Sequence, residues 1–266
     1  MGTLVEQYAA FAIDLDGVIW RGGSLIDGAA SGIAAIREAG KPLLVLTNNG
    51  AYVPSSVVAR LRSAGIELEE REILTSLTVA REWVRRRELT GAPAFVLASP
   101  EVVGQVADMV SVVPVARGVL PALVLVGRDT EISFGRLAAA ADAVRAGAAF
   151  VSLNRDATLP LEGGYLDPGT GAILAALEVA SGRRAVVVGK PEAPMMEAAA
   201  ARLGPGPILM VGDRLESDIA GALRMGWGAA LVLTGVTAAS DRLDPAPDYV
   251  LDSVAGIAGE AEPYRH

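Results

Sequence analysis

Short, fully apolar runs alternate with amphipathic segments along most of the chain. The first run begins at Phe11 and closes in the sequence DLDG at 14–17. Apolar residues at helical spacing follow over 28–39 and stop at Gly40, and a second all-apolar run covers 42–46. Strands that are apolar at every position are typical of parallel sheets buried on both faces. The alternation therefore predicts an α/β fold built on a doubly wound parallel sheet.

The same alternation continues to the end of the chain. Further helices are predicted over 54–64, 78–88, 134–145, 171–180, 193–203 and near 253–258, and further strands over 95–98, 122–126, 149–153, 185–188, 208–211 and 229–232, the last strand of the sheet. Residues 154–170 form the longest polar, glycine-bearing segment. Long loops inside compact domains are usually either functional or disordered, and the apolar and proline residues within this one favour a functional loop.

Polar side chains follow four of the apolar runs. They are Asp14 and Asp16, Thr47 and Asn48, Lys190, and Asp213 and Asp218. Because the carboxyl ends of parallel strands lie along one edge of a sheet, these residues are expected to converge in one cleft.

Each of these motifs also has a purely structural interpretation. The two aspartates repel each other unless a divalent cation lies between them or one stays protonated, but an acidic turn ending a strand has the same sequence. The TNNG sequence at 47–50 is either a turn or a set of neutral donors for an anion. Ser217 as a helix cap would explain Asp218 without a ligand, although it does not explain Asp213. Lys190 is one of only two lysines, which is either chance or the retention of a compact ammonium.

Composition narrows the possible chemistry. The 266 residues are 52% apolar, enough to bury a core in one or two domains. There is no cysteine, which excludes thiol nucleophiles and cysteine-ligated metals, and the single histidine is the last residue, a poor candidate for a zinc site or a catalytic triad. The net charge of −8 without a long basic run argues against nucleic acid, and no apolar run is long enough for a membrane. We expect a cytoplasmic protein whose chemistry uses carboxylates, hydroxyls, amides, lysine, arginine and hard cations.

Carboxylates, a hard cation and one lysine suit a phosphoryl group, whose spread negative charge needs positive charge around it. With no cysteine or usable histidine, an ionised aspartate is the natural nucleophile, and its attack gives an aspartyl-phosphate intermediate.

The motifs DLDGV, TNN, GKP and GDRLESD, with NRDAT and GGYLDPGTG in the segment between the second and third, resemble those of haloacid dehalogenase (HAD) superfamily phosphatases. The closest likeness is to subfamily IIA, the p-nitrophenyl phosphatase and NagD-like group. The resemblance implies a Rossmann-like catalytic core over 1–78 and 184–266. It also implies an inserted α/β cap domain of C2 type over 79–183, which closes over the core and selects the leaving group.

The resemblance also implies roles for the motif residues. Asp14 would be the nucleophile, and Asp16 the general acid and then the general base. Mg²⁺ would be held by Asp14, Asp213, the backbone carbonyl of Asp16, and Asp218 directly or through water. Lys190 would bridge the phosphate and Asp14.

Thr47 and Asn48 would, by the same resemblance, hold phosphate oxygens. The candidates for substrate contact from the cap are Asn154, Asp156, Glu162 and Tyr165. Two features depart from the family pattern: Arg155 stands where proline is frequent, and Gly50-Ala51-Tyr52 stands where arginine or serine is frequent. A homodimer formed through the cap is also implied.

The resulting hypothesis is a Mg²⁺-dependent phosphatase for small-metabolite phosphate monoesters. Sugar phosphates, glycerol phosphate, phosphoglycolate, pyridoxal phosphate and nucleoside monophosphates all fit this chemistry. A phosphotransferase or mutase using the same intermediate is an alternative, as is a non-catalytic protein that binds a phosphate ligand. A dehalogenase would need no metal, so Asp16 and Asp213 argue against that activity.

Overall fold

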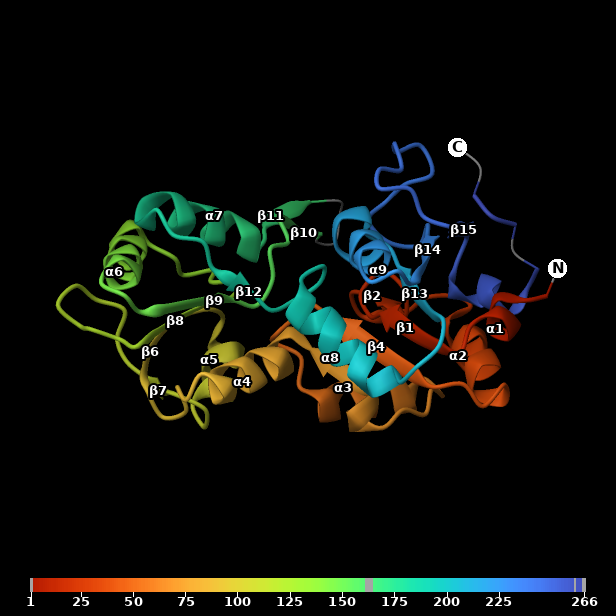
Figure 1. The fold of residues 1–266 in the computed structure, drawn as a ribbon, viewed down its shortest axis with the longest axis horizontal. Helices are drawn as coiled ribbons and strands as arrows, with labels where there is room; N and C mark the ends of the chain where they lie inside the picture. Colours follow the sequence, from red (N-terminus) through yellow and green to blue (C-terminus); the bar gives the residue numbers. More distant parts are fainter. Residues whose placement is uncertain (1, 161–164, 261, 265–266) are drawn as a thin grey trace. The chain divides into compact units, whose positions relative to one another are not determined.

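The computed structural model describes residues 2–160, 165–260 and 262–264, and the chain divides into two compact units (Figure 1). The first unit contains Met1–Thr47, Val53–Leu74 and Lys190–His266, and the second contains Asn48–Tyr52 and Thr75–Gly189. The second unit thus begins four residues before the predicted cap, ends six residues after it, and includes the short segment that follows Thr47.

The first unit is built on a six-stranded sheet with the order β15-β14-β13-β1-β4-β5. Its strands are β1 (Ala10–Asp14), β4 (Leu43–Thr47), β5 (Ile73–Thr75), β13 (Ile208–Gly212), β14 (Gly228–Val232) and β15 (Tyr249–Leu251). β1 is buried at all five positions and pairs in parallel with β4 on one side and β13 on the other. The carboxyl ends of these three strands therefore lie side by side.

Helices α2 (Ala29–Glu38), α3 (Pro54–Ser63), α8 (Ala193–Leu203) and α9 (Ala220–Arg224) lie between these strands in the chain, as expected for parallel crossovers, with the 3₁₀ turn η1 (Glu70–Glu72) before β5. Helix α1 (Leu4–Gln7) precedes β1, and the 3₁₀ segment η4 (Val254–Ala258) follows β15. α8 packs against β1 and β4, and α9 packs against β14. A small antiparallel hairpin, β2 (Trp20–Arg21) and β3 (Ser24–Leu25), follows β1.

The second unit has its own parallel sheet with the order β12-β9-β8-β6-β7. Its strands are β6 (Pro93–Leu97), β7 (Ser111–Val112), β8 (Leu123–Val126), β9 (Ala149–Ser152) and β12 (Val186–Val187), and its helices are α4 (Ser76–Arg86), α5 (Pro100–Val106), α6 (Phe134–Arg145) and α7 (Thr170–Ser181). α6 and α7 pack on each other and share an apolar core with the sheet (Figure 1).

The predicted fold class is confirmed, whereas three local predictions are wrong. The segment 154–170 was expected to be a loop but contains an antiparallel hairpin, β10 (Thr158–Pro160) and β11 (Leu166–Pro168). The last strand of the first unit is β15 rather than 229–232, and the predicted terminal helix is a 3₁₀ segment. These elements are three to five residues long, too short for a periodic pattern to identify them. Among the described residues, no helix combines the length and apolar character needed to cross a bilayer.

Candidate active site

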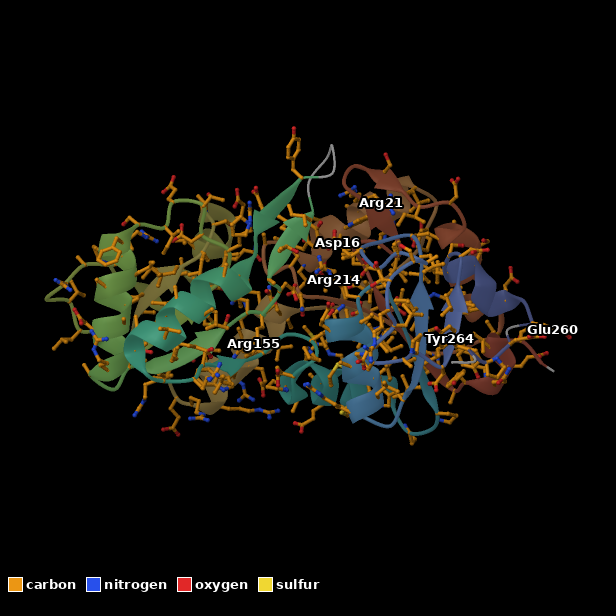
Figure 2. The ribbon with its side chains drawn as sticks, turned by 90° about the horizontal axis from the view of Figure 1, so that it is seen from above. Asp16, Arg21, Arg155, Arg214, Glu260 and Tyr264 are labelled. Atoms are coloured by element: carbon orange, nitrogen blue, oxygen red, sulfur yellow. The ribbon has the colours of Figure 1, made fainter. Side chains whose placement is uncertain are left out.

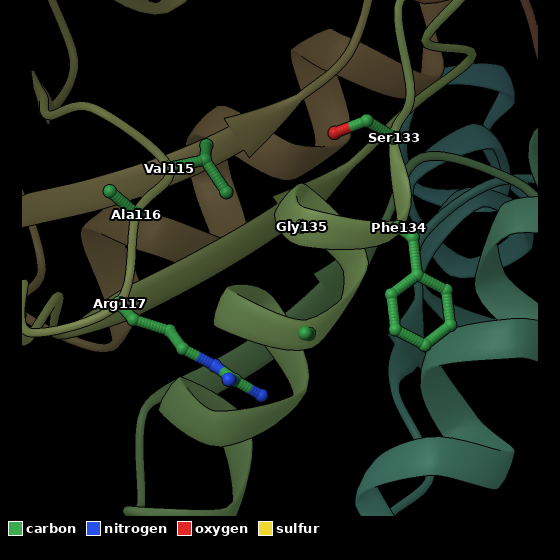
Figure 3. A pocket seen from close by; sticks show the side chains of 7 residues that line it. Val115, Ala116, Arg117, Ser133, Phe134 and Gly135 are labelled. Atoms are coloured by element: carbon green, nitrogen blue, oxygen red, sulfur yellow. The ribbon is translucent and has the colours of Figure 1, made fainter.

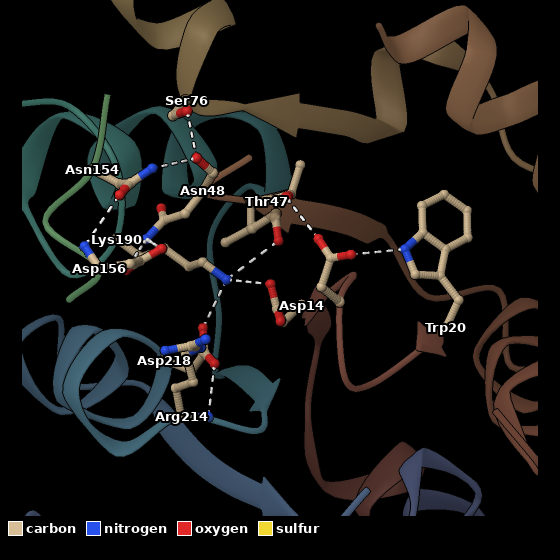
Figure 4. A network of polar contacts seen from close by, with 12 residues as sticks. Asp14, Trp20, Thr47, Asn48, Ser76, Asn154, Asp156, Lys190, Arg214 and Asp218 are labelled. Carbon is tan, nitrogen blue, oxygen red and sulfur yellow. Dashed lines mark hydrogen bonds and ion pairs between the residues drawn. The ribbon is translucent and has the colours of Figure 1, made fainter. Parts of the chain in front are cut away.

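A buried ion cluster lies at the carboxyl end of β1. Lys190 Nζ is 2.5 Å from Asp14 Oδ1 and 2.7 Å from Asp218 Oδ1, and it also donates to the Leu46 carbonyl at 3.3 Å (Figure 4). The side chains of Asp14, Lys190 and Asp218 are all buried. One ammonium therefore holds two carboxylates together in the interior of the first unit.

The strand that precedes Lys190 differs from the one that the sequence analysis predicted. The strand before it, β12, belongs to the sheet of the second unit and not to the sheet that carries Asp14. The prediction that four strand ends share one sheet edge is therefore wrong for Lys190. The residue is the first of the returning first-unit segment, three positions before α8, and α8 packs against β1 and β4.

Asp218 is buried and forms an ion pair with Lys190. Its role is therefore more than that of an acidic residue in the first turn of a helix capped by Ser217. It lies in a π-helical segment, Leu215–Ile219, a rare conformation that is frequent at functional sites. Its Oδ2 accepts a hydrogen bond from the backbone N–H of Arg214 at 3.1 Å. A side chain at Gly212 would overlap the Asp218 carboxylate, so the glycine lets the two segments approach closely.

Asp213 completes a group of three carboxylates. One oxygen of each of Asp14, Asp213 and Asp218 lies within 4.8 Å of the others. Asp213 Oδ2 accepts from the Val236 backbone N–H at 2.7 Å, whereas Oδ1 is buried and accepts no hydrogen bond from the described residues. A Cβ at Gly235 would overlap the Asp213 carboxylate, so the glycine allows the backbone of this loop to lie directly against that carboxylate.

Electrostatics in the cluster favour an additional positive charge. Burial raises the pKa of Asp14 well above its usual range, and the charges of Asp218 and Asp213 raise it further, against the lowering effect of Lys190. Burial and the neighbouring Asp218 raise the pKa of Asp213 to about 6. Burial lowers the pKa of Lys190, but the charges of Asp14 and Asp218 outweigh it and raise the pKa above its usual value. One ammonium does not neutralise three buried carboxylates, and the uncoordinated Asp213 Oδ1 fits a hard cation that prefers oxygen ligands.

Asp16, labelled in Figure 2, is not one of these three carboxylates, and its carboxyl group makes other contacts. Trp20 donates its indole Nε1–H to Asp16 Oδ1 at 3.0 Å, and the Thr47 hydroxyl lies 3.5 Å from Oδ2. The sequence analysis did not identify Trp20. Trp20 lies on the two-residue strand β2, which is too short for a periodic pattern to identify.

Asn48, expected to hold phosphate, belongs to the second unit and is bound there by other predicted site residues. Its side chain donates to the two carboxylate oxygens of Asp156 at 3.1 and 3.3 Å. Its backbone carbonyl accepts from Asn154 Nδ2 at 2.8 Å and from the Ser76 hydroxyl at 2.9 Å. Asn154 is buried and its Oδ1 accepts from the backbone N–H of Asp156 at 3.1 Å. The structure thus brings Asn48, Asn154 and Asp156 together as one network (Figure 4).

Arg155, which departs from the family's proline, anchors this network to α7. It donates to both oxygens of Glu178, at 3.0 and 2.9 Å. Glu178 also accepts from Arg184 at 2.7 Å and from the backbone N–H of Ala185 at 3.1 Å. The Arg155 hydrogen bonds outweigh partial burial and lower the pKa of Glu178 to about 2.

Two predicted substrate residues remain. Tyr165 is 74% exposed next to β11, and Glu162 lies outside the described residues. In the segment Gly50-Ala51-Tyr52, which departs from the family pattern, the backbone carbonyl of Ala51 accepts a hydrogen bond from Gln105 Nε2 at 2.8 Å.

Two cavities lie within single units, and neither is lined by a predicted site residue. One of about 440 Å³ lies between the chain around Val115 and the start of α6 at Phe134 (Figure 3). The other, of about 520 Å³, lies beside Tyr8 and Tyr249 in the first unit. Neither lining set offers the lysine and paired carboxylates that the cluster around Asp14 provides.

Comparison with known proteins places the chain in a family. A model for haloacid dehalogenase-like hydrolases matches residues 11–109, and a second model described as HAD-hydrolase-like matches residues 187–257. An acid sugar phosphatase from Staphylococcus saprophyticus is 31% identical over 262 residues, which cover 97% of this chain and 100% of the relative.

Two solved structures are similar over almost the whole chain. A p-nitrophenyl phosphatase from Archaeoglobus fulgidus has a TM-score of 0.84 and 29% identity, covering 94% of this chain and 98% of its own. A glycerol phosphate phosphatase from Mycobacterium tuberculosis, in complex with magnesium, has a TM-score of 0.80 and 31% identity, covering 97% of this chain and 78% of its own. This chain belongs to the haloacid dehalogenase-like hydrolases, in their p-nitrophenyl phosphatase and NagD-like group, and is a phosphatase.

Proposed function

We propose that the protein is a Mg²⁺-dependent phosphomonoesterase that hydrolyses small-metabolite phosphate esters through an aspartyl-phosphate on Asp14. The observation that carries this proposal is the buried group of Asp14, Asp213 and Asp218 around a single ammonium, that of Lys190. Three buried carboxylates beside one ammonium carry excess negative charge, and one of their oxygens, Asp213 Oδ1, accepts no hydrogen bond from the described residues. Such a group fits a site that receives a cation together with a phosphoryl group.

In the first step, a carboxylate oxygen of Asp14 attacks phosphorus, and the bond from phosphorus to the ester oxygen breaks. Asp16 gives its proton to that oxygen, so the product leaves as an alcohol. In the second step, Asp16 takes a proton from water as the water oxygen attacks phosphorus, which releases inorganic phosphate and restores Asp14. Lys190 orients Asp14 and offsets negative charge through both steps.

The metal would be held by the carboxylates of Asp14, Asp213 and Asp218 and by the backbone carbonyl of Asp16. When bound, Mg²⁺ offsets the negative charge of the phosphoryl oxygens. Support comes from the uncoordinated Asp213 Oδ1 in this chain and from the magnesium complex of the related glycerol phosphate phosphatase.

We propose that Thr47 and Asn48 donate hydrogen bonds to the phosphate. Within the second unit, Asn154 and Asp156 would orient Asn48, and Asp156 would face the substrate. We also propose that this unit acts as the cap domain that selects the leaving group, with Tyr165 as a candidate contact. A homodimer would form through the same unit.

The relatives indicate which esters to test. Their names include acid sugar phosphatase, glycerol phosphate phosphatase and p-nitrophenyl phosphatase. A phosphate-release panel should contain sugar phosphates, glycerol phosphate, p-nitrophenyl phosphate, phosphoglycolate, pyridoxal phosphate and nucleoside monophosphates. Product analysis with added alcohols separates transfer to water from transfer to a hydroxyl acceptor.

The decisive variant is Asp14→Asn, which keeps the size of the side chain but removes the nucleophilic oxygen. We expect it to abolish Mg²⁺-dependent phosphate release while circular dichroism shows an intact fold. Activity within a few-fold of wild type would exclude Asp14 as the nucleophile.

A further inference from the structure

A chain of contacts inside the first unit connects Asp16 to helix α3. Trp20 is only 2% exposed, and its indole N–H is bonded to Asp16 Oδ1 at 3.0 Å (Figure 4). Arg60 of α3 stacks over the indole, with its Cζ 4.0 Å from the ring centroid. The same guanidinium donates to the Gly22 carbonyl at 2.6 Å, in the turn between β2 and β3. One arginine thus holds both Trp20 and the hairpin on which it lies.

The indole contact restricts how Asp16 presents its carboxyl group. An indole nitrogen donates a hydrogen bond and does not accept one, so Asp16 Oδ1 acts as an acceptor there. The proton that Asp16 gives or takes is therefore assigned to Oδ2, because its neighbour at 3.5 Å, the Thr47 hydroxyl, can accept a hydrogen bond as well as donate one. A rotation of the carboxyl group would break the bond to Trp20, which is buried and held by Arg60.

We propose that Trp20 is a positioning residue for Asp16 and that Arg60 holds Trp20 in place. This inference rests on the proposed role of Asp16 as the acid in ester cleavage. When the phosphorus–oxygen bond breaks, its electron pair goes to the leaving oxygen, and the proton from Asp16 Oδ2 forms the new O–H bond. Asp16 is left as a carboxylate, ready to take a proton from water.

The inference predicts a dependence on the leaving group. A p-nitrophenolate is stable without a proton because its ring spreads the charge, whereas an unsubstituted phenolate needs the proton more. Loss of correct Asp16 geometry should therefore harm phenyl phosphate more than p-nitrophenyl phosphate. The two esters have similar shapes, so a change in substrate binding would affect both.

The test variant is Trp20→Phe, which keeps a flat ring under Arg60 and removes the N–H donor. We expect kcat/KM for phenyl phosphate to fall about tenfold or more and kcat/KM for p-nitrophenyl phosphate to stay within about threefold, since general acid catalysis contributes roughly 10²–10⁴-fold in total. Arg60→Met keeps the N–H donor but removes the stacking and the bond to Gly22, and it should give the same pattern with a smaller amplitude.

The matched control is Trp83→Phe. Trp83 lies on α4 in the second unit and also has an arginine over its ring, with Arg87 Cζ 5.1 Å from the centroid. This variant should leave both kcat/KM values unchanged.

Equal loss on the two esters, or no loss on either, would overturn the inference. Should Trp20→Phe fail to fold, Arg60→Met decides alone, and an unselective effect there counts against the inference. Failure of the proposed function looks different, because wild-type protein would then release no phosphate from either ester or Asp14→Asn would remain active.

Discussion

Replacement of Glu178 by glutamine tests the ion cluster that anchors the segment carrying Asn154 and Asp156. The side chain of Glu178 is 5% exposed and accepts hydrogen bonds from Arg155, Arg184 and a backbone N–H. Glutamine has one acceptor oxygen instead of two, and its NH₂ group would face the guanidinium of Arg155. The variant therefore loses a buried charge and leaves one of the two Arg155 hydrogen bonds without its acceptor.

The magnitude follows from the pKa of Glu178, which is lowered from 4.5 to about 2. A difference of about 2.5 pH units corresponds to about 3.4 kcal/mol at about 1.36 kcal/mol per unit. The Arg184 side chain is 82% exposed, so solvent screens its share. We expect Glu178→Gln to lower the free energy of unfolding by about 1.5–3 kcal/mol at pH 7.

The expected effect depends on pH with a defined sign. Because the folded pKa is below the unfolded one, the charged Glu178 stabilises the fold fully above about pH 5 and loses this contribution as pH falls from 4.5 towards 2. The difference between wild type and Glu178→Gln should thus be constant from pH 6 to 8 and shrink in acid. Urea unfolding at each pH measures it, and amide hydrogen exchange over α7 shows whether the loss is local.

Glu82→Gln is the matched control. The pKa of Glu82 is also lowered to about 2, by hydrogen bonds from Arg85 and then Arg86, but its side chain is exposed to solvent. Its substitution should affect stability much less than that of Glu178. Equal losses in the two variants, or a loss below about 0.5 kcal/mol for Glu178→Gln, would refute the argument that burial strengthens the cluster.

Three further predictions concern the candidate site. Gly235→Ala places a methyl group against the Asp213 carboxylate, so a Mg²⁺ titration of phosphate release should show weaker apparent metal affinity; an unchanged titration would mean that Asp213 is not confined by this loop. Lys190→Met removes the ammonium from two buried carboxylates, and phosphate release should fall at least a hundredfold, about 2.7 kcal/mol; near-normal turnover would contradict its role. Asn154→Ala removes a donor from the Asn48 carbonyl and should raise KM more than it lowers kcat, which steady-state kinetics on p-nitrophenyl phosphate can check.

The sequence predicted the parts of the site that depend on local pattern. Asp14 ends strand β1 and Asp213 directly follows strand β13, and the two strands pair with each other, so the convergence of the two aspartates follows from the parallel sheet. The neighbouring strand β4 brings Thr47 to the same edge. The ends of these strands can be recognised in the sequence because each continuous apolar run is followed directly by a polar motif.

The other contacts in the structure could not be predicted in the same way. Lys190 follows a strand of the other sheet, and nothing in its local sequence distinguishes that sheet from the first. Trp20 lies on a two-residue strand, too short for an alternating pattern. Glu178 did leave a signal that was missed, because it is a lone acid in the apolar stretch of the predicted helix over 171–180. A buried charge in that position requires partners of opposite charge, and Arg155 and Arg184 provide them.

The central claim is that Asp14 carries the phosphoryl group between the two steps, and trapping that group tests it most directly. In Asp16→Asn the water that completes the reaction has no base, so the intermediate should accumulate with p-nitrophenyl phosphate, whose good leaving group allows the first step. Acid quenching followed by peptide mass spectrometry should find a phosphoryl group on Asp14, and none in Asp14→Asn. Continued phosphate release without a covalent adduct, or an adduct on another residue, would contradict the account.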